Sequence, residues 1–350
     1  MNNIKNWLQT RFPFNWDILK VAGSEPVPNH LKHWWWCLGG TPLYLFIVQI
    51  FTGILLSFYY VPGYNEAYDS VKNITENISY GWYIRSLHKW SANFMIISVI
   101  LHMMRVFFTG SYRKPRELNW MMGVLLLTFT LITGFTGYSL IFEQLSYWGI
   151  TVATNIMGAV PFVGDSIAAF IRGGEKITQL TLSRMFMFHA AILPTTLIFV
   201  IIIHITMIRL HGVTEFAFKK SDRKKHFPFY PEHLITEIII ALVIMIGISI
   251  LAILFPIGLE EKANPLVTPA HIKPEWYFYF AFRLLKLTSL TASVFIMGGG
   301  FMILLMWPFI DEYIRKRKPN SELSMILGVF GVILLTGLTL WEAIALFLSH

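Results

Sequence analysis

The sequence predicts an all-α integral membrane protein with about seven transmembrane helices. Of its 350 residues, 55% are hydrophobic and only 14% are charged, whereas soluble domains carry about a quarter charged residues. The apolar residues fall in separate blocks of about 20, the length that crosses the hydrocarbon core of a bilayer as a helix. A water-soluble enzyme is therefore excluded, and a single cysteine, Cys37, excludes a disulfide framework.

Seven blocks are long enough to span a membrane. In chain order they cover residues 37–60, 86–108, 120–142, 185–208, 235–256, 291–310 and 323–348. The segment before them mixes charges with aromatic residues, which is typical of an interfacial helix. Two of the connections, 143–182 and 257–290, are too long to be simple loops, and connections of that length are usually functional.

Basic residues indicate the orientation of the chain. Most of the lysines and arginines outside the spans lie in the N-terminal segment and around residues 113–116, 219–225 and 315–318. The positive-inside rule then puts these segments and the N-terminus in the cytoplasm. The second and fourth spans consequently run from outside to inside. The charged stretch 219–227 separates four spans from three, and we expect two domains, residues 1–215 and 216–350.

Four histidines lie inside the apolar spans, where each is costly and indicates a functional site. His88 and His102 are 14 residues apart in the second span, and His189 and His204 are 15 apart in the fourth. Both intervals are about four helical turns, or roughly 21 Å. His88 therefore matches His189 in depth, and His102 matches His204. Any one histidine could simply hydrogen-bond between helices, but four at matched depths favour two haem irons, each held by two imidazoles.

Glycines and basic residues support this interpretation. Gly39 and Gly53 in the first span, and Gly123 and Gly137 in the third, repeat the interval of 14 residues. A residue without Cβ lets a helix approach the flat face of a macrocycle, although small residues also serve ordinary helix packing. Basic residues at the histidine depths are candidates to pair with haem propionates, or they anchor helix ends in headgroups. They are Arg85, Lys89 and Arg184 outside, and Arg105, Lys114 and Arg116 inside.

With these motifs, the sequence resembles the cytochrome b family of bc-type quinol-oxidising complexes, and most closely the cytochrome b6 branch. The likeness covers nearly the whole chain, and seven spans correspond to a four-helix, haem-binding b6 part fused to a three-helix part similar to subunit IV. It rests on YGWYIRSLHKWSAN, ILHMMRVFFTGSYRKPRELNW, TGYSL, QLSYWG, LSRMFMFHAAILP, IIIHITMIR and PAHIKPEWYFYFAFRLLK, which contains the family motif PEWY.

The resemblance implies an electron-transfer subunit that oxidises quinol at an outer pocket. One electron would pass to a Rieske iron–sulfur partner, and the other would cross through two b haems to an inner quinone. The low-potential haem would lie at His88/His189 and the high-potential haem at His102/His204. The outer pocket would be bordered by Pro274, Glu275, Trp276, Tyr277, Tyr138, Trp148 and Gly149. Glu275 is chemically suited to accept a proton from quinol there.

The inner pocket and the remaining partners are also implied by the resemblance. Arg209 and Glu237 would border the inner quinone, and Cys37, in a CLGG context, would hold a third, c-type haem by one thioether bond. Partners would include a c-type cytochrome subunit, membrane lipid and a second copy of the complex, but no nucleic acid. The membrane would be an energy-transducing one of a bacterium or archaeon.

One departure and two alternatives remain. After TGYSL many family members have Pro-Trp, where this chain has Ile141 and Phe142 followed by Glu143, so the shape of the outer pocket is not implied. A transporter or proton channel could use histidines and Glu275 as a relay, and the membrane anchor of a dehydrogenase also binds two haems. A reduced-minus-oxidised visible spectrum distinguishes the transporter, which has no haem bands.

Overall fold

A computed structural model describes residues 26–28, 31, 38–214, 226–269 and 272–348. Within them, seven helices are long and apolar enough to cross a membrane, which confirms the predicted class. They are α3 (Gly40–Ser57), α5 (Gly81–Phe108), α6 (Glu117–Ser139), the continuous stretch Gln179–His211, the stretch Phe229–Leu254, α13 (Leu290–Arg317) and α14 (Leu323–Leu348). The candidate haem attachment site Cys37 and the predicted domain boundary at 215/216 lie outside, or at the edge of, the described residues.

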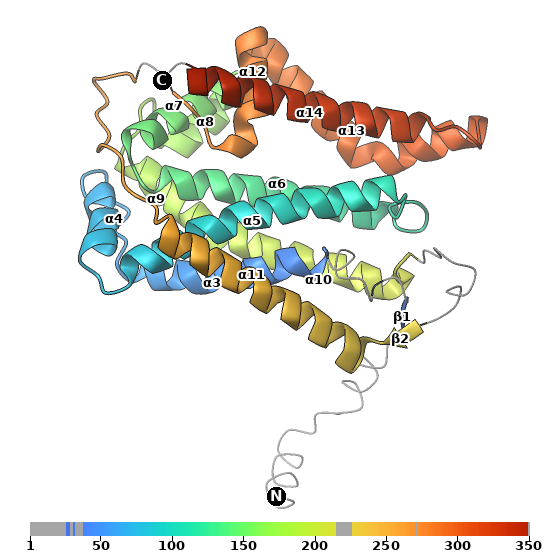
Figure 1. The fold of residues 1–350 in the computed structure, drawn as a ribbon. Helices are drawn as coiled ribbons and strands as arrows, with labels where there is room; N and C mark the ends of the chain where they lie inside the picture. Colours follow the sequence, from blue (N-terminus) through green and yellow to red (C-terminus); the bar gives the residue numbers. More distant parts are fainter. Residues whose placement is uncertain (1–25, 29–30, 32–37, 215–225, 270–271, 349–350) are drawn as a thin grey trace, which may run out of the picture.

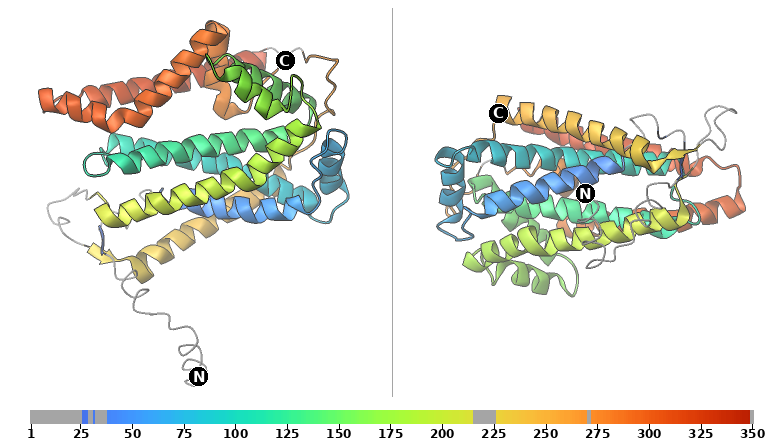
Figure 2. Two further views of the ribbon diagram at one scale, coloured as in Figure 1. Left: turned by 180° about the vertical axis from the view of Figure 1, so that it is seen from behind. Right: turned by 90° about the horizontal axis from the view of Figure 1, so that it is seen from below.

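The helices run roughly parallel to one another in a flattened bundle (Figure 1). Helix α5 packs on α3, α6 packs on α10 (Leu193–His211), and these four surround the histidines. Helix α11 (Leu234–Leu254) covers α5 and α3, while α13 covers α6 and α14 packs on the short helix α12 (Tyr279–Leu287). Figure 2 shows the same arrangement from behind and from below. The four-helix part and the three-helix part thus share one body.

Two ends of the bundle differ in their connections. At the predicted outer end lie the short helices α4 (Ala67–Glu76), α7 (Gln144–Gly158), α8 (Gly164–Arg172) and α12, together with the 3₁₀ turn η6 (Trp276–Phe278). At the predicted inner end, β1 (Pro26–Pro28) pairs antiparallel with β2 (His226–Pro228). The two long connections therefore do carry structure of their own, as their length indicates.

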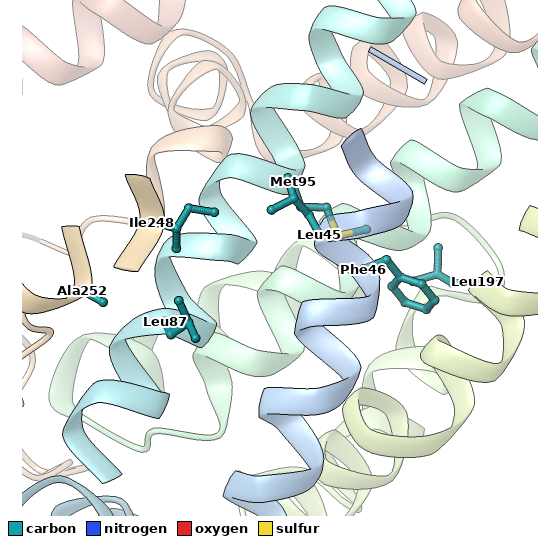
Figure 3. Packing of buried hydrophobic residues seen from close by; sticks show 7 residues of the cluster. All are labelled: Leu45, Phe46, Leu87, Met95, Leu197, Ile248 and Ala252. Carbon is teal, nitrogen blue, oxygen red and sulfur yellow. The ribbon is translucent and has the colours of Figure 1, made fainter. Parts of the chain in front are cut away.

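A buried apolar cluster lies in the middle of the bundle (Figure 3). It contains Leu45 and Phe46 of α3, Leu87 and Met95 of α5, Leu197 of α10, and Ile248 and Ala252 of α11. Met95 is midway between His88 and His102 of α5, and Leu197 is midway along the chain between His189 and His204 of the fourth span. Apolar side chains thus separate the two histidine levels.

Helix α13 ends later than the sequence predicts, at Arg317 rather than at residue 310. The last turns of the helix are charged and therefore lie beyond the apolar block. Ion pairs between residues four positions apart stabilise these turns as helix. Arg315 pairs with Asp311 at 3.1 Å and Lys316 with Glu312 at 2.9 Å. Asp311 also accepts a hydrogen bond from Arg113 at 2.9 Å, which joins α13 to the α5–α6 loop.

The fourth span is not a regular α-helix throughout. Helix α9 (Gln179–Met187) continues into a π-helical turn, η3 (Phe188–Ile192), before α10 begins. Pro194, in the first turn of α10, has no N–H and cannot bond the carbonyl four residues earlier. The backbone forms a wider π turn where this hydrogen bond is missing, and such turns are frequent at functional sites. His189 lies within it.

Candidate functional site

The outer histidine pair is formed by His88 of α5 and His189 of the π turn. Their ring centroids are 6.2 Å apart and the ring planes make an angle of 74°. Thr52 of α3 lies 2.7 Å from Nδ1 of His88, and the carbonyl of Thr133 of α6 lies 3.0 Å from Nδ1 of His189. Four separate helices therefore position one pair of imidazoles.

These hydrogen bonds determine which ring nitrogen carries the proton. The Thr52 hydroxyl donates to the carbonyl of Val48 at 2.7 Å, so it accepts from Nδ1–H of His88. A carbonyl can only accept, so Nδ1 of His189 also carries its proton. Both Nε2 atoms are then unprotonated and available to a metal, and an Nδ1–H donated to an oxygen is the usual support of a metal-bound histidine.

The inner pair, His102 of α5 and His204 of α10, lines a cavity of about 260 Å³ at the predicted inner end. Arg105 and Arg116 line it too, as does Glu237 of α11. Nδ1 of His204 is buried and has no hydrogen-bond partner among the described residues. With His233, which also lines it, the cavity combines three imidazoles, two guanidinium groups and a carboxylate.

Each of the four predicted glycines faces a histidine ring. A Cβ at Gly39 would lie 3.4 Å from Cε1 of His102, and one at Gly123 would lie 3.7 Å from Cε1 of His204. At the outer level, a Cβ at Gly53 would lie 3.5 Å from Cε1 of His88, and one at Gly137 only 2.6 Å from Cε1 of His189. The repeated interval of 14 residues thus matches the histidine levels, and Gly137 is the position with the least room.

The histidine pairs fit a haem better than a bare metal ion. In the described part of the chain no group of three or more His, Cys, Asp or Glu side chains converges, so a free ion would lack protein ligands. A haem would supply four nitrogen ligands of its own and would need only the two imidazoles from the protein. Two metal–imidazole bonds of about 2 Å, plus the radii of both rings, put the centroids about 6 Å apart, close to the 6.2 Å between His88 and His189.

Not all of the predicted propionate partners lie at the histidines. Arg85 donates to the carbonyls of Ile257 and Gly258 at 2.7 and 3.0 Å, Arg184 contacts Phe170, and Lys114 lines a separate depression beside Asp311. The Arg85 side chain therefore binds the loop after α11 and does not face the outer histidine pair. Arg105 and Arg116 line the inner cavity, although Arg116 also donates to the carbonyls of Gly212 and His211 at 3.0 and 3.2 Å.

The PEWY segment lies against α5 and α6. Glu275 forms an ion pair with Lys89, and the indole of Trp276 donates to Asn93 at 2.7 Å. Pro274 is half-buried in the loop that leads to them. Tyr277 is buried, and burial, with Glu275 and Tyr138 nearby, raises its phenol pKa well above the usual value. Its hydroxyl therefore stays protonated and can donate a hydrogen bond.

Tyr138 of α6 lies next to this segment. The ammonium of Lys89 is 5.7 Å from the centre of its ring, and a Cβ on Gly149 would lie 3.3 Å from it. Trp148 donates to the carbonyl of Val267 at 3.1 Å. The structure thus brings Glu275, Tyr277, Trp276 and Tyr138 to one region near the outer histidine pair.

Sequence reasoning missed two features of this region. A Cβ on Gly134 would lie 2.9 Å from the hydroxyl of Tyr277, so Gly134 makes room for the PEWY tyrosine. Glu143 is buried at the corner between α6 and α7, and burial raises the pKa of its carboxyl. The acidic residue was visible in the sequence after Phe142, but its burial was not.

At the inner end, Glu237 is 3.5 Å from Nε2 of His233 one turn earlier. Its carboxylate packs directly against Gly40 at the start of α3, and both it and His233 line the inner cavity. Arg209, at the end of α10, lies 5.1 Å above the ring of Phe229. The cavity lining includes Glu237 but not Arg209.

Comparison with known proteins defines the class. Residues 22–212 match the family model described as cytochrome b/b6/petB, and residues 262–346 match the one described as cytochrome b (C-terminal)/b6/petD. This integral membrane bundle therefore belongs to the cytochrome b/b6 family, which implies b-type haems. It combines the b6-type N-terminal and the subunit IV-like C-terminal parts in one chain.

Relatives and one solved structure agree with that membership. The chain is 36% identical over 341 residues, 95% of its length and 78% of the relative's, to a cytochrome bc complex cytochrome b subunit of Chlorobaculum thiosulfatiphilum. It is 43% identical over 209 residues, 60% of its length and 98% of the relative's, to cytochrome b6 of Heliomicrobium gestii. A chain of a hyperthermophilic respiratory Complex III superposes with a TM-score of 0.78 at 26% identity, covering 98% of both chains.

Proposed function

We propose that this chain is the cytochrome b subunit of a bc-type oxidoreductase complex that oxidises quinol at its outer end. Electrons then cross the membrane to a quinone at the inner end. The observation that carries the proposal is the pair of histidine levels in one four-helix bundle, each faced by glycines from the two flanking helices. The names of the relatives and of the solved structure support membership of such a complex.

Two b haems, each held by two histidines, would supply one-electron carriers inside the membrane. His88 and His189 would hold the outer one, and Thr52 and the carbonyl of Thr133 orient those two rings. His102 and His204 would hold the inner one, about 21 Å away along α5. Arg105 and Arg116 are placed to neutralise its propionates.

Quinol oxidation would take place beside the PEWY segment. Glu275 would accept a proton from the quinol, a role for which a carboxylate in a partly apolar cleft is suited. Glu275 forms an ion pair with Lys89 of α5. Tyr277 and Tyr138 would border the ring of the substrate, and Trp276 is fixed by its bond to Asn93.

The inner end would reduce quinone. Glu237 in the inner cavity, supported by His233, can supply a proton, and Arg209 lies at the same end of the bundle. A thioether between Cys37 and a third, c-type haem would add a redox centre there. The partners would be a Rieske iron–sulfur protein, a c-type cytochrome subunit and a second copy of the complex.

Orientation and organisation are part of the same proposal. The N-terminus would face the cytoplasm of a bacterium or archaeon, so that the loops with α7, α8 and α12, which carry fewer lysines and arginines, face outward. Residues 1–215 would form the dihaem domain and residues 216–350 the domain that contributes PEWY. Asp311, which holds Arg113 and Arg315, joins the two domains at the inner end.

The haem assignment is tested by the reduced-minus-oxidised spectrum of the purified complex. His189→Ala should remove the outer haem band and leave the inner one, since the other pair lies about four turns away. Retention of both bands would eliminate His189 as a ligand. A wild-type complex without haem bands would refute the function as a whole.

The chemistry is tested with Glu275→Gln, whose amide keeps the shape of the side chain and cannot accept a proton. We expect quinol oxidation to slow by roughly 100-fold, the lower part of the range for general base catalysis, with both haem bands normal. An unchanged rate and pH profile at saturating quinol would mean that the segment is only structural.

A further inference from the structure

Glu342 is the single charged residue among the 26 residues of α14, and its side chain is fully buried. A charged group inside an apolar spanning helix is costly, and such residues usually face the interior of the bundle and serve a function. The oxidation site described above does not include Glu342. Its place near the outer end of α14 therefore calls for a physical reason.

Both charged partners of Glu342 come from α12. Nζ of Lys286 lies 2.6 Å from Oε1, and Nε of Arg283 lies 3.2 Å from Oε2. The guanidinium of Arg283 also lies 4.3 Å from the ring centre of Trp341, the residue before Glu342 in α14. Arg283 and Lys286 are three residues apart, so they project from one face of α12. The cluster therefore fixes the position and the rotation of α12 on α14.

Helix α12 is the direct continuation of the PEWY segment. The 3₁₀ turn that contains Trp276 and Tyr277 ends at Phe278, and α12 begins at Tyr279. Arg283 is six residues beyond Tyr277, which is about 9 Å along a helix. Helix α14 packs on both the turn and α12, and Figure 1 shows α12 beside α14. A shift of α12 on α14 would therefore displace the PEWY side chains.

The other side of the PEWY segment is held by α5. Glu275 pairs with Lys89, and the indole of Trp276 donates to Asn93 at 2.7 Å. Stability alone does not explain why α12 is held by charges on its other side, because replacing a buried ion cluster by apolar residues is often neutral for stability. An ion cluster differs from apolar packing in its direction, since each charged group must meet a particular partner.

Building on the proposed quinol oxidation, we propose that Glu342 is a positioning residue of the outer site. Through Arg283 and Lys286 it sets where α12 lies on α14, and it thereby places Glu275 and Tyr277 against α5 and α6. Glu342 acts without contact with the quinol. A misplacement of about 1 Å at a reacting group can slow a reaction by about 100-fold, so a residue outside the pocket can control its rate.

The test measures quinol oxidation by the purified complex in a double-mutant cycle of Glu342→Gln and Glu275→Gln. The amide keeps the shape of Glu342 but removes its charge, which leaves Arg283 without its ionic partner. We expect Glu342→Gln alone to slow oxidation roughly 10-fold, with both haem bands normal, because the groups that face the histidines lie on other helices. In the Glu275→Gln background the same change should cost little more, since residues that act through one another are not additive.

Asp311→Asn is the matched control. Asp311 is also buried and also pairs with two cations, Arg113 and Arg315, but at the inner end of the bundle. Both single substitutions should lower the temperature of thermal unfolding, because each leaves buried or half-buried cations without their partner. Only Glu342→Gln should slow quinol oxidation.

Lys286→Gln keeps the inference testable if Glu342→Gln does not assemble. It leaves Arg283 paired with Glu342, and it should show the same pattern with a smaller loss of rate. A wild-type rate in Glu342→Gln, or in Lys286→Gln where that variant is used, would overturn the inference. So would an undiminished further loss in the Glu275→Gln background, or an equal loss of rate in Asp311→Asn. A wild-type complex that does not oxidise quinol would instead refute the proposed function, so the two failures are distinguishable.

Discussion

Gly137→Ala should expel the outer haem, because position 137 has no room for a methyl group. The added Cβ would lie 2.6 Å from Cε1 and 3.2 Å from Nδ1 of His189, whereas ordinary contacts begin at 3.4 Å. Removing the overlap with Cε1 requires a displacement of about 0.8 Å. A metal–imidazole bond would be only about 2 Å long, so a shift of that size would stop His189 from holding the proposed haem. It also strains the 3.0 Å hydrogen bond to Thr133.

Gly123→Ala is the matched control at the inner level. The same change there puts Cβ 3.7 Å from Cε1 of His204, an ordinary contact. The assay is the reduced-minus-oxidised spectrum and haem content of detergent-purified protein, with immunoblots of the membrane fraction to verify insertion. We expect Gly137→Ala to insert and lose the outer haem, while Gly123→Ala keeps both. Full haem content in Gly137→Ala, or equal losses in the two variants, would refute the reasoning.

Three further predictions concern other parts of the chain. Gly134→Ala should push the hydroxyl of Tyr277, 2.9 Å from the new Cβ, and slow quinol oxidation by up to about 100-fold with both haem bands unchanged; a normal rate would exclude this contact from the site. Asp311→Asn should lower the free energy of unfolding by about 2 kcal/mol, less than for a fully buried pair because Arg113 is 43% exposed, as followed by thermal unfolding. Cys37→Ser should abolish haem staining in a denaturing gel, and an unstained wild-type band would leave Cys37 as a free thiol.

The spans and the histidine levels could be predicted because the membrane restricts the possible structures. Only helices of about 20 residues satisfy the backbone in hydrocarbon, so apolar blocks define the elements and chain order defines their direction. The second and fourth spans run in the same direction, so the position of each histidine along its span gives its depth in the membrane. By depth, His88 pairs with His189. The threonines that orient these rings could not be found in this way, since Thr52 and Thr133 come from other helices and the sequence offers many equivalent threonines.

Contacts between charged residues in distant loops were also beyond the sequence. Glu275 was predicted as a base, but its partner Lys89 lies 186 residues earlier, and no local pattern relates the two. Arg85 was expected at a propionate, yet it binds loop carbonyls near residue 257. Long flexible side chains reach several alternative partners, and their choice depends on how the loops fold over the end of the bundle.

The unequal histidine intervals show why local backbone geometry matters for the site. At about 100° per residue, 14 residues fall about 40° short of four turns, whereas 15 residues exceed four turns by about 60°. In a regular helix, the side chains of His189 and His204 would therefore point in directions about 60° apart. Those of His88 and His102 on α5 are about 40° apart in the opposite sense, so the two helices would not present their histidines in matching directions. The π turn at Phe188–Ile192 absorbs one extra residue, so 15 residues advance about as far as 14 do on α5. Since Pro194 removes the hydrogen bond that a regular helix would form there, the proline favours the turn that aligns the two histidine levels.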